Sequence, residues 1–122
     1  MLFDTDVLIW AQRKNPKAFE VIGDAERHFI SVQTYMELLQ GARNQADMRI
    51  IKSFLSEVDF ETLPLTENIG HRALIYIEEY ALSSGLRSAD ALIAATALEN
   101  GLALVTSNQK HFKPIKELKL FP

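Results

Sequence analysis

The sequence predicts an α/β fold, a three-layer α/β/α sandwich in which helices cover both faces of a short, mostly parallel central sheet. Two observations lead to this prediction. Short apolar runs typical of buried strands alternate with longer segments of helical periodicity, and capping residues stand where the helical segments begin. Strands separated by helices pair in parallel, because each helix crosses back over the sheet. We expect the whole chain, residues 1–122, to form a single domain.

The first half of the chain contains two predicted strands and three predicted helices. Residues 1–4 form a short buried strand that ends in an acid, and residues 28–31 form the second strand. Asn15 is a helix cap signal and Pro16 suits the first helical position, while Ser31 caps the next helix. Apolar residues at helical spacing define this helix and the one after it: Val32, Tyr35, Met36 and Leu39, then Ile51, Phe54, Leu55 and Val58.

The second half of the chain is predicted to hold a long helix, a second helix and the remaining strands. Thr66 caps the long helix and Gly85 ends it. Ser88 is predicted to cap the following helix, which stops at Gly101. The predicted strands of this half are 59–64, 102–106 and, at the edge of the sheet, 118–121.

Composition excludes several classes of function. The chain has no cysteine, which rules out disulfide scaffolds, thiolate zinc sites and cysteine nucleophiles. The net charge of −3 differs from the positive charge of a general nucleic-acid coat. No apolar run approaches the roughly 20 residues of a membrane span, and the first residues lack the pattern of a signal peptide. We therefore expect a cytoplasmic protein that has no contact with a membrane.

Acidic and amide side chains follow the predicted strands. Asp4 and Asp6 come directly after the first strand, and Glu37 lies early in the helix after the second. Asp90 lies in the first turn of a later helix, and Asn108 follows the last buried strand. Sites in parallel α/β sheets form beyond the carboxyl ends of the strands, so we expect these residues to converge on one cleft.

Convergent carboxylates predict a cation. Two like charges about 4 Å apart cost roughly 4 kcal/mol at an effective dielectric of 20, and a bound divalent ion removes that cost. Oxygen ligands without histidine or cysteine favour Mg²⁺ or Mn²⁺ over zinc. Such an ion activates water and stabilises charge on a phosphate, which are the two requirements of phosphodiester hydrolysis.

Each of these residues also has a purely structural interpretation. Asp4 suits a helix cap, and Thr34 with Glu37 matches a capping box. Asp90 complements a helix dipole, and Asn108 is typical of a turn. No single residue therefore identifies the site, and the prediction depends on their shared position at one edge of the sheet.

The surroundings of Glu37 favour a functional role. On a helical wheel Glu37 lies about 140° from Val32, outside the predicted apolar stripe. Gly41 lies one turn later on nearly the same side, and a glycine inside a helix costs roughly 1 kcal/mol against alanine. Gly41 would leave room beside Glu37 for a substrate backbone, while close packing of helices is the alternative explanation.

Four segments, in order along the chain, together resemble the motifs of the PIN domain, and the third is the most distinctive. They are Asp4 to Ile9; Ile30 and Ser31 followed by Thr34, Glu37, Leu38, Gly41 and Ala42; Ser88 to Ala97; and Leu104 to Asn108 followed by His111 and Phe112.

The resemblance implies an α/β/α fold and a Mg²⁺- or Mn²⁺-dependent endonuclease that cleaves RNA. By position, Asp4, Glu37 and Asp90 would be the metal-binding catalytic carboxylates, and Thr106 would brace the site by hydrogen bonding. Short members of this kind resemble VapC toxins of toxin–antitoxin pairs. This implies RNA as the substrate, a small cognate antitoxin as a partner, and a homodimer.

One position departs from the family pattern. The fourth acidic position is occupied by Asn108, which can hold a metal-bound water through its carbonyl but adds no negative charge. We therefore expect one tightly held metal ion. Asp6 is a supporting residue that could compensate for the missing charge, and the alternative is that it is simply a first-turn helix residue.

Basic residues near the predicted cleft are candidates for holding RNA phosphates. Arg87 and Lys110 are preferred because they neighbour Asp90 and Asn108 in the sequence, and Arg43 is a third candidate. The alternative for each is a solvated surface charge. Trp10 is expected to serve in packing or in a dimer contact rather than in base stacking.

Three other functions fit parts of the sequence. In a haloacid-dehalogenase-like phosphatase, Asp4 would be the nucleophile and Asp6 the acid/base, although no later strand ends in the expected acidic pair. A receiver-like signalling module fits the length and the acidic start, but Asp59 begins its strand instead of ending it. A catalytically weak PIN scaffold that binds RNA or a protein partner is left open by Asn108.

Overall fold

A four-stranded parallel sheet of order β3–β2–β1–β4 forms the centre of the computed structural model, which describes residues 1–121. The strands are β1 (Leu2–Phe3), β2 (His28–Ser31), β3 (Phe60–Leu63) and β4 (Leu104–Val105). The helices are α1 (Thr5–Gln12), α2 (Pro16–Asp24), α3 (Val32–Gln40), α4 (Gln45–Glu57), α5 (Glu67–Ser84), α6 (Ser88–Glu99) and α7 (Gln109–Phe112).

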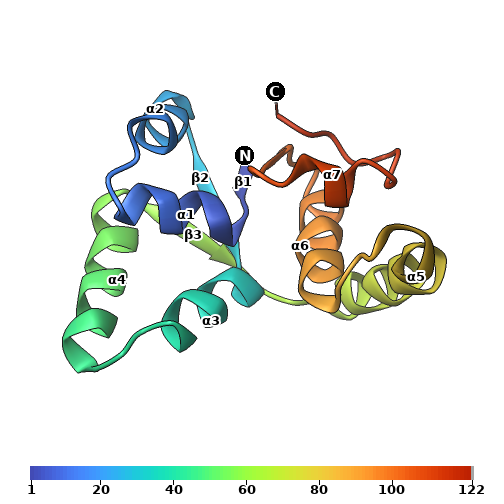
Figure 1. The fold of residues 1–122 in the computed structure, drawn as a ribbon, viewed down its shortest axis with the longest axis horizontal. Coiled ribbons are helices and arrows are strands. Elements are labelled where there is room, and N and C mark those ends of the chain that lie inside the picture. Colours follow the sequence, from blue (N-terminus) through green and yellow to red (C-terminus); the bar gives the residue numbers. More distant parts are fainter. Residues whose placement is uncertain (122) are drawn as a thin grey trace.

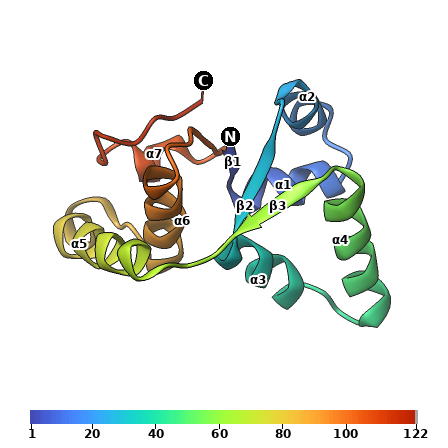
Figure 2. The same cartoon turned by 180° about the vertical axis from the view of Figure 1, so that it is seen from behind.

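Alternate residues of each strand enter two different cores, because successive side chains of a strand point to opposite faces of the sheet. Leu2 and Leu104 pack with residues of α5, α6 and α7. Their neighbours Phe3 and Val105 pack with residues of α1 to α4. Figures 1 and 2 show these two groups of helices on either side of the sheet. The predicted three-layer α/β fold is confirmed.

Local capping determines where the helices begin and end. The Asn15 side chain accepts hydrogen bonds from two backbone N–H groups of α2, and Ser31 and Thr66 do the same for one N–H group each of α3 and α5. Each such cap is worth about 1 kcal/mol. Gly85 ends α5 with a φ of +69°, a left-handed conformation that glycine adopts without strain. These four predicted boundaries are confirmed.

Helix α3 differs from its prediction in three ways. The predicted capping box is wrong, because Thr34 is a buried residue inside the helix. The buried face is formed by Thr34 and Leu38, while Met36 of the predicted apolar stripe is 47% exposed. Gly41 is not inside the helix but is its C-cap, and a Cβ added there would meet only ordinary contacts with the carbonyls of Glu37 and Leu38. The glycine therefore ends the helix and does not make special room.

Helix α6 begins one residue earlier than predicted. Arg87, in an extended conformation, is the N-cap, and Ser88 is already the first helical residue. The Arg87 backbone N–H donates to Oδ2 of Asp90 at 3.3 Å. Instead of a serine hydroxyl that accepts from the first turn, the carboxylate at the third helical position accepts from the N–H of the N-cap residue.

The last two predicted strands are shorter than expected, and α7 was not predicted. The N–H of Leu102 donates to the carbonyl of Ala97, so residue 102 closes α6 and does not join the sheet. Segment 118–121 contributes only one parallel bridge, between Leu104 and Leu120. Among the described residues, no helix combines the length and apolar character needed to cross a membrane.

Candidate active site

Asp4 lies at the carboxyl end of the central strand β1 and is the N-cap of α1. Its side chain is buried, with 7% of the residue exposed. Oδ1 accepts a hydrogen bond from the Thr5 backbone N–H and Oδ2 accepts one from the Thr106 hydroxyl, both at 2.8 Å. The orientation of the carboxylate is therefore fixed from two strands, because Thr106 follows β4.

The electrostatic surroundings of Asp4 disfavour its charge. Burial, and then the negative charge of Asp6, raise the pKa of Asp4 to about 7, with a smaller contribution from Asp90. The hydrogen bonds from Thr106 and Thr5 act in the opposite direction and are outweighed. A cation bound nearby would oppose these effects and favour the charged form.

Asp6 lies two residues further on, in the first turn of α1. Its Oδ2 accepts hydrogen bonds from both the backbone N–H and the hydroxyl of Ser107. Its Oδ1 is buried and has no hydrogen-bond partner among residues 1–121. A buried acceptor without a partner costs about 1–3 kcal/mol, so this oxygen is available to a ligand from outside the chain.

Glu37 reaches the site through a chain of hydroxyl groups. The Thr5 hydroxyl donates to Oε1 of Glu37 at 2.9 Å and lies 3.1 Å from the hydroxyl of Thr34. The Thr34 hydroxyl in turn lies 3.3 Å from that of Ser31 at the end of β2. Thr5 and Ser31 therefore join the ends of two neighbouring strands and orient Glu37.

Asp90 comes to the site from the start of α6. Its Oδ2, which caps the helix, lies 3.6 Å from Nδ1 of His111. The same ring nitrogen lies 3.0 Å from Nδ2 of Asn108, and the Asn108 backbone N–H donates to the Thr106 hydroxyl at 3.0 Å. The Asn108 side chain is therefore engaged with His111.

We define the acidic cluster as Asp4, Asp6 and Asp90, whose charges act on one another, with Glu37 joined to it through Thr5. Within residues 1–121, no three acidic or histidine side chains stand close enough to form a complete metal-binding group. The donor set nevertheless fits a hard divalent cation: it consists of oxygen atoms, one of them buried without a partner, around a carboxylate whose charge is disfavoured.

Thr5, Ser107 and His111 contact the carboxylates but were not predicted as site residues, although all three lie in the segments that resemble the family motifs. Thr5 and Ser107 are ordinary turn and cap residues by pattern. His111 has one sequence signal, its position three residues after Asn108 in the fourth motif. Their roles depend on long-range contacts that only the folded chain provides.

The three basic candidates lie around the site in different environments. Arg43 forms an ion pair with Asp47 at 3.0 Å and lines a groove of about 640 Å³ that also contains Glu37. Arg87 and Lys110 are exposed, and neither forms an ion pair within the part of the chain that the structure describes. Arg87 and Lys110 are therefore the cations that remain available to a negatively charged ligand.

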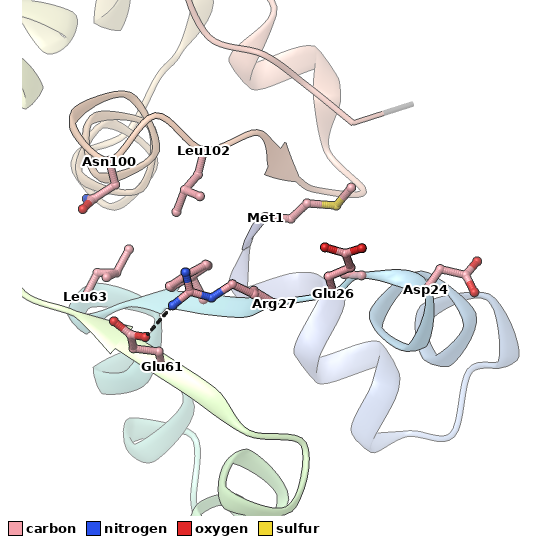
Figure 3. A pocket seen from close by; sticks show the side chains of 10 residues that line it. Met1, Asp24, Glu26, Arg27, Glu61, Leu63, Asn100 and Leu102 are labelled. Atoms are coloured by element: carbon pink, nitrogen blue, oxygen red, sulfur yellow. Dashed lines mark hydrogen bonds and ion pairs between the residues drawn. The ribbon is translucent and has the colours of Figure 1, made fainter.

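A second hollow of about 640 Å³ lies at the opposite, amino ends of the strands (Figure 3). Its wall includes Asp24, Glu26 and an Arg27 guanidinium that lies 3.3 Å from Glu61 and 4.7 Å from the centre of the Phe29 ring. The charge of Arg27 is already matched there. The size of a hollow therefore does not identify the functional site. The carboxylates without a positively charged partner lie at the other end of the sheet, in the acidic cluster.

Comparison with known proteins identifies the family to which the chain belongs. Residues 1–118 match the model of the PIN domain. No curated protein sequence matches the chain. Among solved structures, a toxin–antitoxin complex from Klebsiella pneumoniae contains a chain 29% identical, with 96% of this chain and 93% of that chain covered and a TM-score of 0.81.

Two further structures share the fold. VapBC-1 from nontypeable Haemophilus influenzae is similar at 25% identity, with 98% and 95% coverage and a TM-score of 0.82. DNA-bound VapBC from Salmonella typhimurium is similar at 23% identity, with the same coverage and TM-score. The fold is thus shared over nearly the whole length of both chains.

Proposed function

Because this chain belongs to the PIN-domain family, whose members are generally nucleases, we propose that it is an endoribonuclease that requires Mg²⁺ or Mn²⁺. The observation that carries this proposal is the acidic cluster. Asp4 is buried with both oxygens fixed by hydrogen bonds, and its charge is opposed by Asp6 and Asp90. No lysine or arginine of residues 1–121 forms an ion pair with any of the three.

The proposed ligands of the cation are Asp4, Asp90 and Glu37. When bound, a divalent ion activates water for attack on a phosphodiester and stabilises the charge that develops on the phosphate. Thr106 and the Thr5 backbone N–H hold the Asp4 carboxylate in one orientation while leaving acceptor positions on both of its oxygens. The Thr5 hydroxyl performs the same positioning role for Glu37.

The supporting groups limit how many cations bind tightly. Asp6 offers its buried Oδ1, whereas Asn108 supplies no charge and its side chain contacts His111. We infer one tightly held ion, with a second ion bound weakly or only together with RNA. The phosphates of the RNA would contact Arg87 and Lys110, and Arg43 more weakly because it is already paired with Asp47.

The proposed biological setting is a toxin–antitoxin pair, with this chain as a VapC-type toxin. The support is the similarity of this chain to chains of the Klebsiella and Haemophilus toxin–antitoxin complexes over nearly their whole length. A small antitoxin and a second copy of this chain are the expected protein partners. Exposed apolar side chains on both helical layers, such as Ile50 and Leu74, leave surface for such contacts.

Cleavage of a single-stranded RNA with added Mg²⁺, with Mn²⁺ and with EDTA tests the proposal. We expect cleavage only with the ions, and a loss of at least roughly 100-fold in Asp90→Asn, because that change removes a charged ligand. Asp59→Asn is the matched control, since Asp59 is exposed and its φ of +60° suits asparagine. Equal cleavage with EDTA, or full activity of Asp90→Asn, would exclude this function.

The phosphatase alternative receives no support from the geometry. A phosphorylated nucleophile needs an oxygen that a phosphate ester can approach, but Asp4 is only 7% exposed. Asp6, the acid/base of that alternative, is held by Ser107. Incubation with a small phosphate ester and a search for phosphoaspartate is therefore expected to give a negative result.

A further inference from the structure

A smaller pocket, of about 380 Å³, lies beside the acidic cluster. Its walls come from α1, α2 and the C-terminal segment around Phe121. Thr106 and Ser107, which hold the carboxylates of Asp4 and Asp6, also line this pocket. The volume is at the small end of the range for ligand sites, which suits one planar ring better than a larger molecule.

The apolar walls of the pocket include two aromatic side chains. Trp10 is 44% exposed, so a large part of its surface remains free to contact a ligand in addition to the part that packs against the protein. Phe121 is half-buried on another wall, and Val21 adds an aliphatic surface. The Arg13 guanidinium, which lines the neighbouring groove that contains Glu37, lies 5.7 Å from the centre of the Trp10 ring.

Two amides give the pocket a fixed donor and a fixed acceptor. Oδ1 of Asn15 caps α2, which leaves its NH₂ group for a ligand. Nε2 of Gln109 donates to the Phe121 carbonyl at 2.9 Å, which leaves its Oε1 as an acceptor. Among the residues that line the pocket there is no carboxylate, and Lys17 is exposed at the edge. The chemistry matches a neutral ring with polar edges that carries a phosphate.

The position of the pocket relates it to the acidic cluster. Trp10 lies one helical turn after Asp6 on the same side of α1, about 6 Å along the helix axis. A ring stacked on Trp10 would therefore belong to a nucleotide next to a phosphate held at the cluster. A base in a duplex is already stacked and paired, so only an unpaired base has its faces available.

We propose that this pocket binds one unpaired nucleobase of the RNA, adjacent to the phosphate that is cleaved. This inference rests on the proposed nuclease function and adds to it a preference for single-stranded RNA. Trp10 supplies the stacking surface, Asn15 and Gln109 contact the base edge, and Lys17 contacts the neighbouring phosphate.

The fluorescence of the chain reports directly on the pocket, because Trp10 is its single tryptophan. The full chain is titrated in EDTA with a uridine hexamer, an adenosine hexamer and a ribose-phosphate hexamer that lacks bases. We expect both base-bearing oligomers to change the emission and to bind roughly 10-fold or more tightly than the abasic one, in line with the usual strength of stacking on an aromatic residue. Equal binding of all three would overturn the proposal.

Kinetics with Mg²⁺ provide the second measurement. Trp10→Ala is expected to raise KM for a single-stranded RNA roughly 10-fold or more while kcat stays within about 3-fold, and Trp10→Phe to restore most of the loss. Val21→Phe, which fills the pocket, is expected to raise KM as well. The matched control is Phe19→Ala, which removes an aromatic side chain of α2 that is 47% exposed and lies outside the pocket.

The outcomes separate this inference from the proposed function. If the protein cleaves RNA but KM is unchanged in Trp10→Ala and Val21→Phe, the pocket proposal fails and the nuclease function stands. If the protein cleaves no RNA, the nuclease function fails, and the titration in EDTA still decides whether bases bind. If Trp10→Ala changes the sedimentation of the protein without changing RNA binding, the pocket is a protein contact and the proposal is overturned.

Discussion

Two groups of carboxylates in this molecule differ in whether a positively charged side chain of the protein pairs with them. On the layer of α5 and α6, Glu99 and Glu117 share Arg72, whose Nε lies 2.6 Å from Glu99 and whose Nη1 lies 3.8 Å from Glu117. The hydroxyl of Tyr76 donates to Glu117 at 2.8 Å. This second group, which we call the Arg72 cluster, therefore receives a cation from within the fold.

The acidic cluster has the opposite arrangement. Asp4 and Asp6 receive only neutral donors, from hydroxyl and backbone N–H groups, and one oxygen of Asp6 receives none within residues 1–121. Keeping these charges together lowers the stability of the folded chain. We infer from this difference that the Arg72 cluster serves the fold, whereas the acidic cluster fits our proposal of a cation that comes from outside the chain.

The strongest test of this contrast is Asp4→Asn. We expect RNA cleavage to fall by roughly 10³-fold, because the central charged ligand is lost. We also expect the free energy of unfolding of the metal-free protein to rise by about 1–3 kcal/mol at pH 8, because a buried, opposed charge is removed. Asparagine retains an acceptor for the Thr5 N–H and has a donor for Thr106. Denaturant unfolding together with a cleavage assay measures both effects, and a variant that is inactive and also less stable would contradict the contrast.

The pH dependence of stability tests the same charge without a mutation. The pKa of Asp4 is raised to about 7 in the folded chain, while the unfolded chain releases this proton near 3.8. The folded state therefore holds an extra proton between these values, and its contribution to stability is complete below about pH 4 and is lost as the pH rises through 7. We expect the metal-free protein to lose about 2–4 kcal/mol between pH 4 and pH 8, and Asp4→Asn to lack this loss.

Magnesium should reverse this loss in the wild type alone. An ion that binds only the folded state raises its stability, and it binds best where the carboxylates are charged. Melting curves with and without Mg²⁺ at pH 5 and pH 8 should show the larger upward shift at pH 8, and almost none in Asp4→Asn. The same shift in both proteins at both pH values would indicate that the ion binds elsewhere.

The Arg72 cluster should respond in the opposite way. Arg72→Gln is expected to lower the free energy of unfolding by about 1–3 kcal/mol, because Glu99 and Glu117 lose a charged hydrogen-bond donor. RNA cleavage at a permissive temperature should be unchanged. Arg27→Gln is the matched control: both members of its pair with Glu61 are mostly exposed, so an effect below about 1 kcal/mol is expected. Loss of cleavage in a folded Arg72→Gln protein would show that the two clusters are coupled.

The sequence predicts local features of this molecule better than long-range contacts, for a physical reason. The caps at Asn15, Ser31 and Thr66 depend on hydrogen bonds that span two or three residues, and each was predicted correctly. The apolar runs of the strands are also local, and they predicted the strands of the parallel sheet. The partners of the acidic residues are not local. Thr106 and Asp4 are separated by 102 residues, and only the family resemblance, not the local pattern, led us to expect a hydrogen bond from Thr106 in the site.

The same limit explains the errors at α3 and α6. Thr34 matched a capping box by spacing, but its hydroxyl lies near those of Thr5 and Ser31, which the fold brings to it. At α6 the spacing selected Ser88, whereas the Asp90 carboxylate caps the Arg87 N–H. Residue types at fixed spacing predict that a polar contact will form, but the partner is chosen by the tertiary structure.

The smallest expected effect concerns Asn108, the position where the acidic cluster has an amide in place of a charge. Asn108→Asp adds a carboxylate 3 residues before His111, whose ring contacts both the present amide and Asp90. We expect the Mg²⁺ concentration for half-maximal cleavage to fall about 2- to 5-fold, since one more charge near a hydrated cation is worth about 1 kcal/mol or less in a partly exposed site. Cleavage assays over a magnesium titration measure this midpoint, with Asp59→Asn unchanged as the control. An unchanged midpoint would show that residue 108 is too far from the cation to affect its binding. The side chain of Asn108 would then serve only to contact His111, and the cation would be held without it.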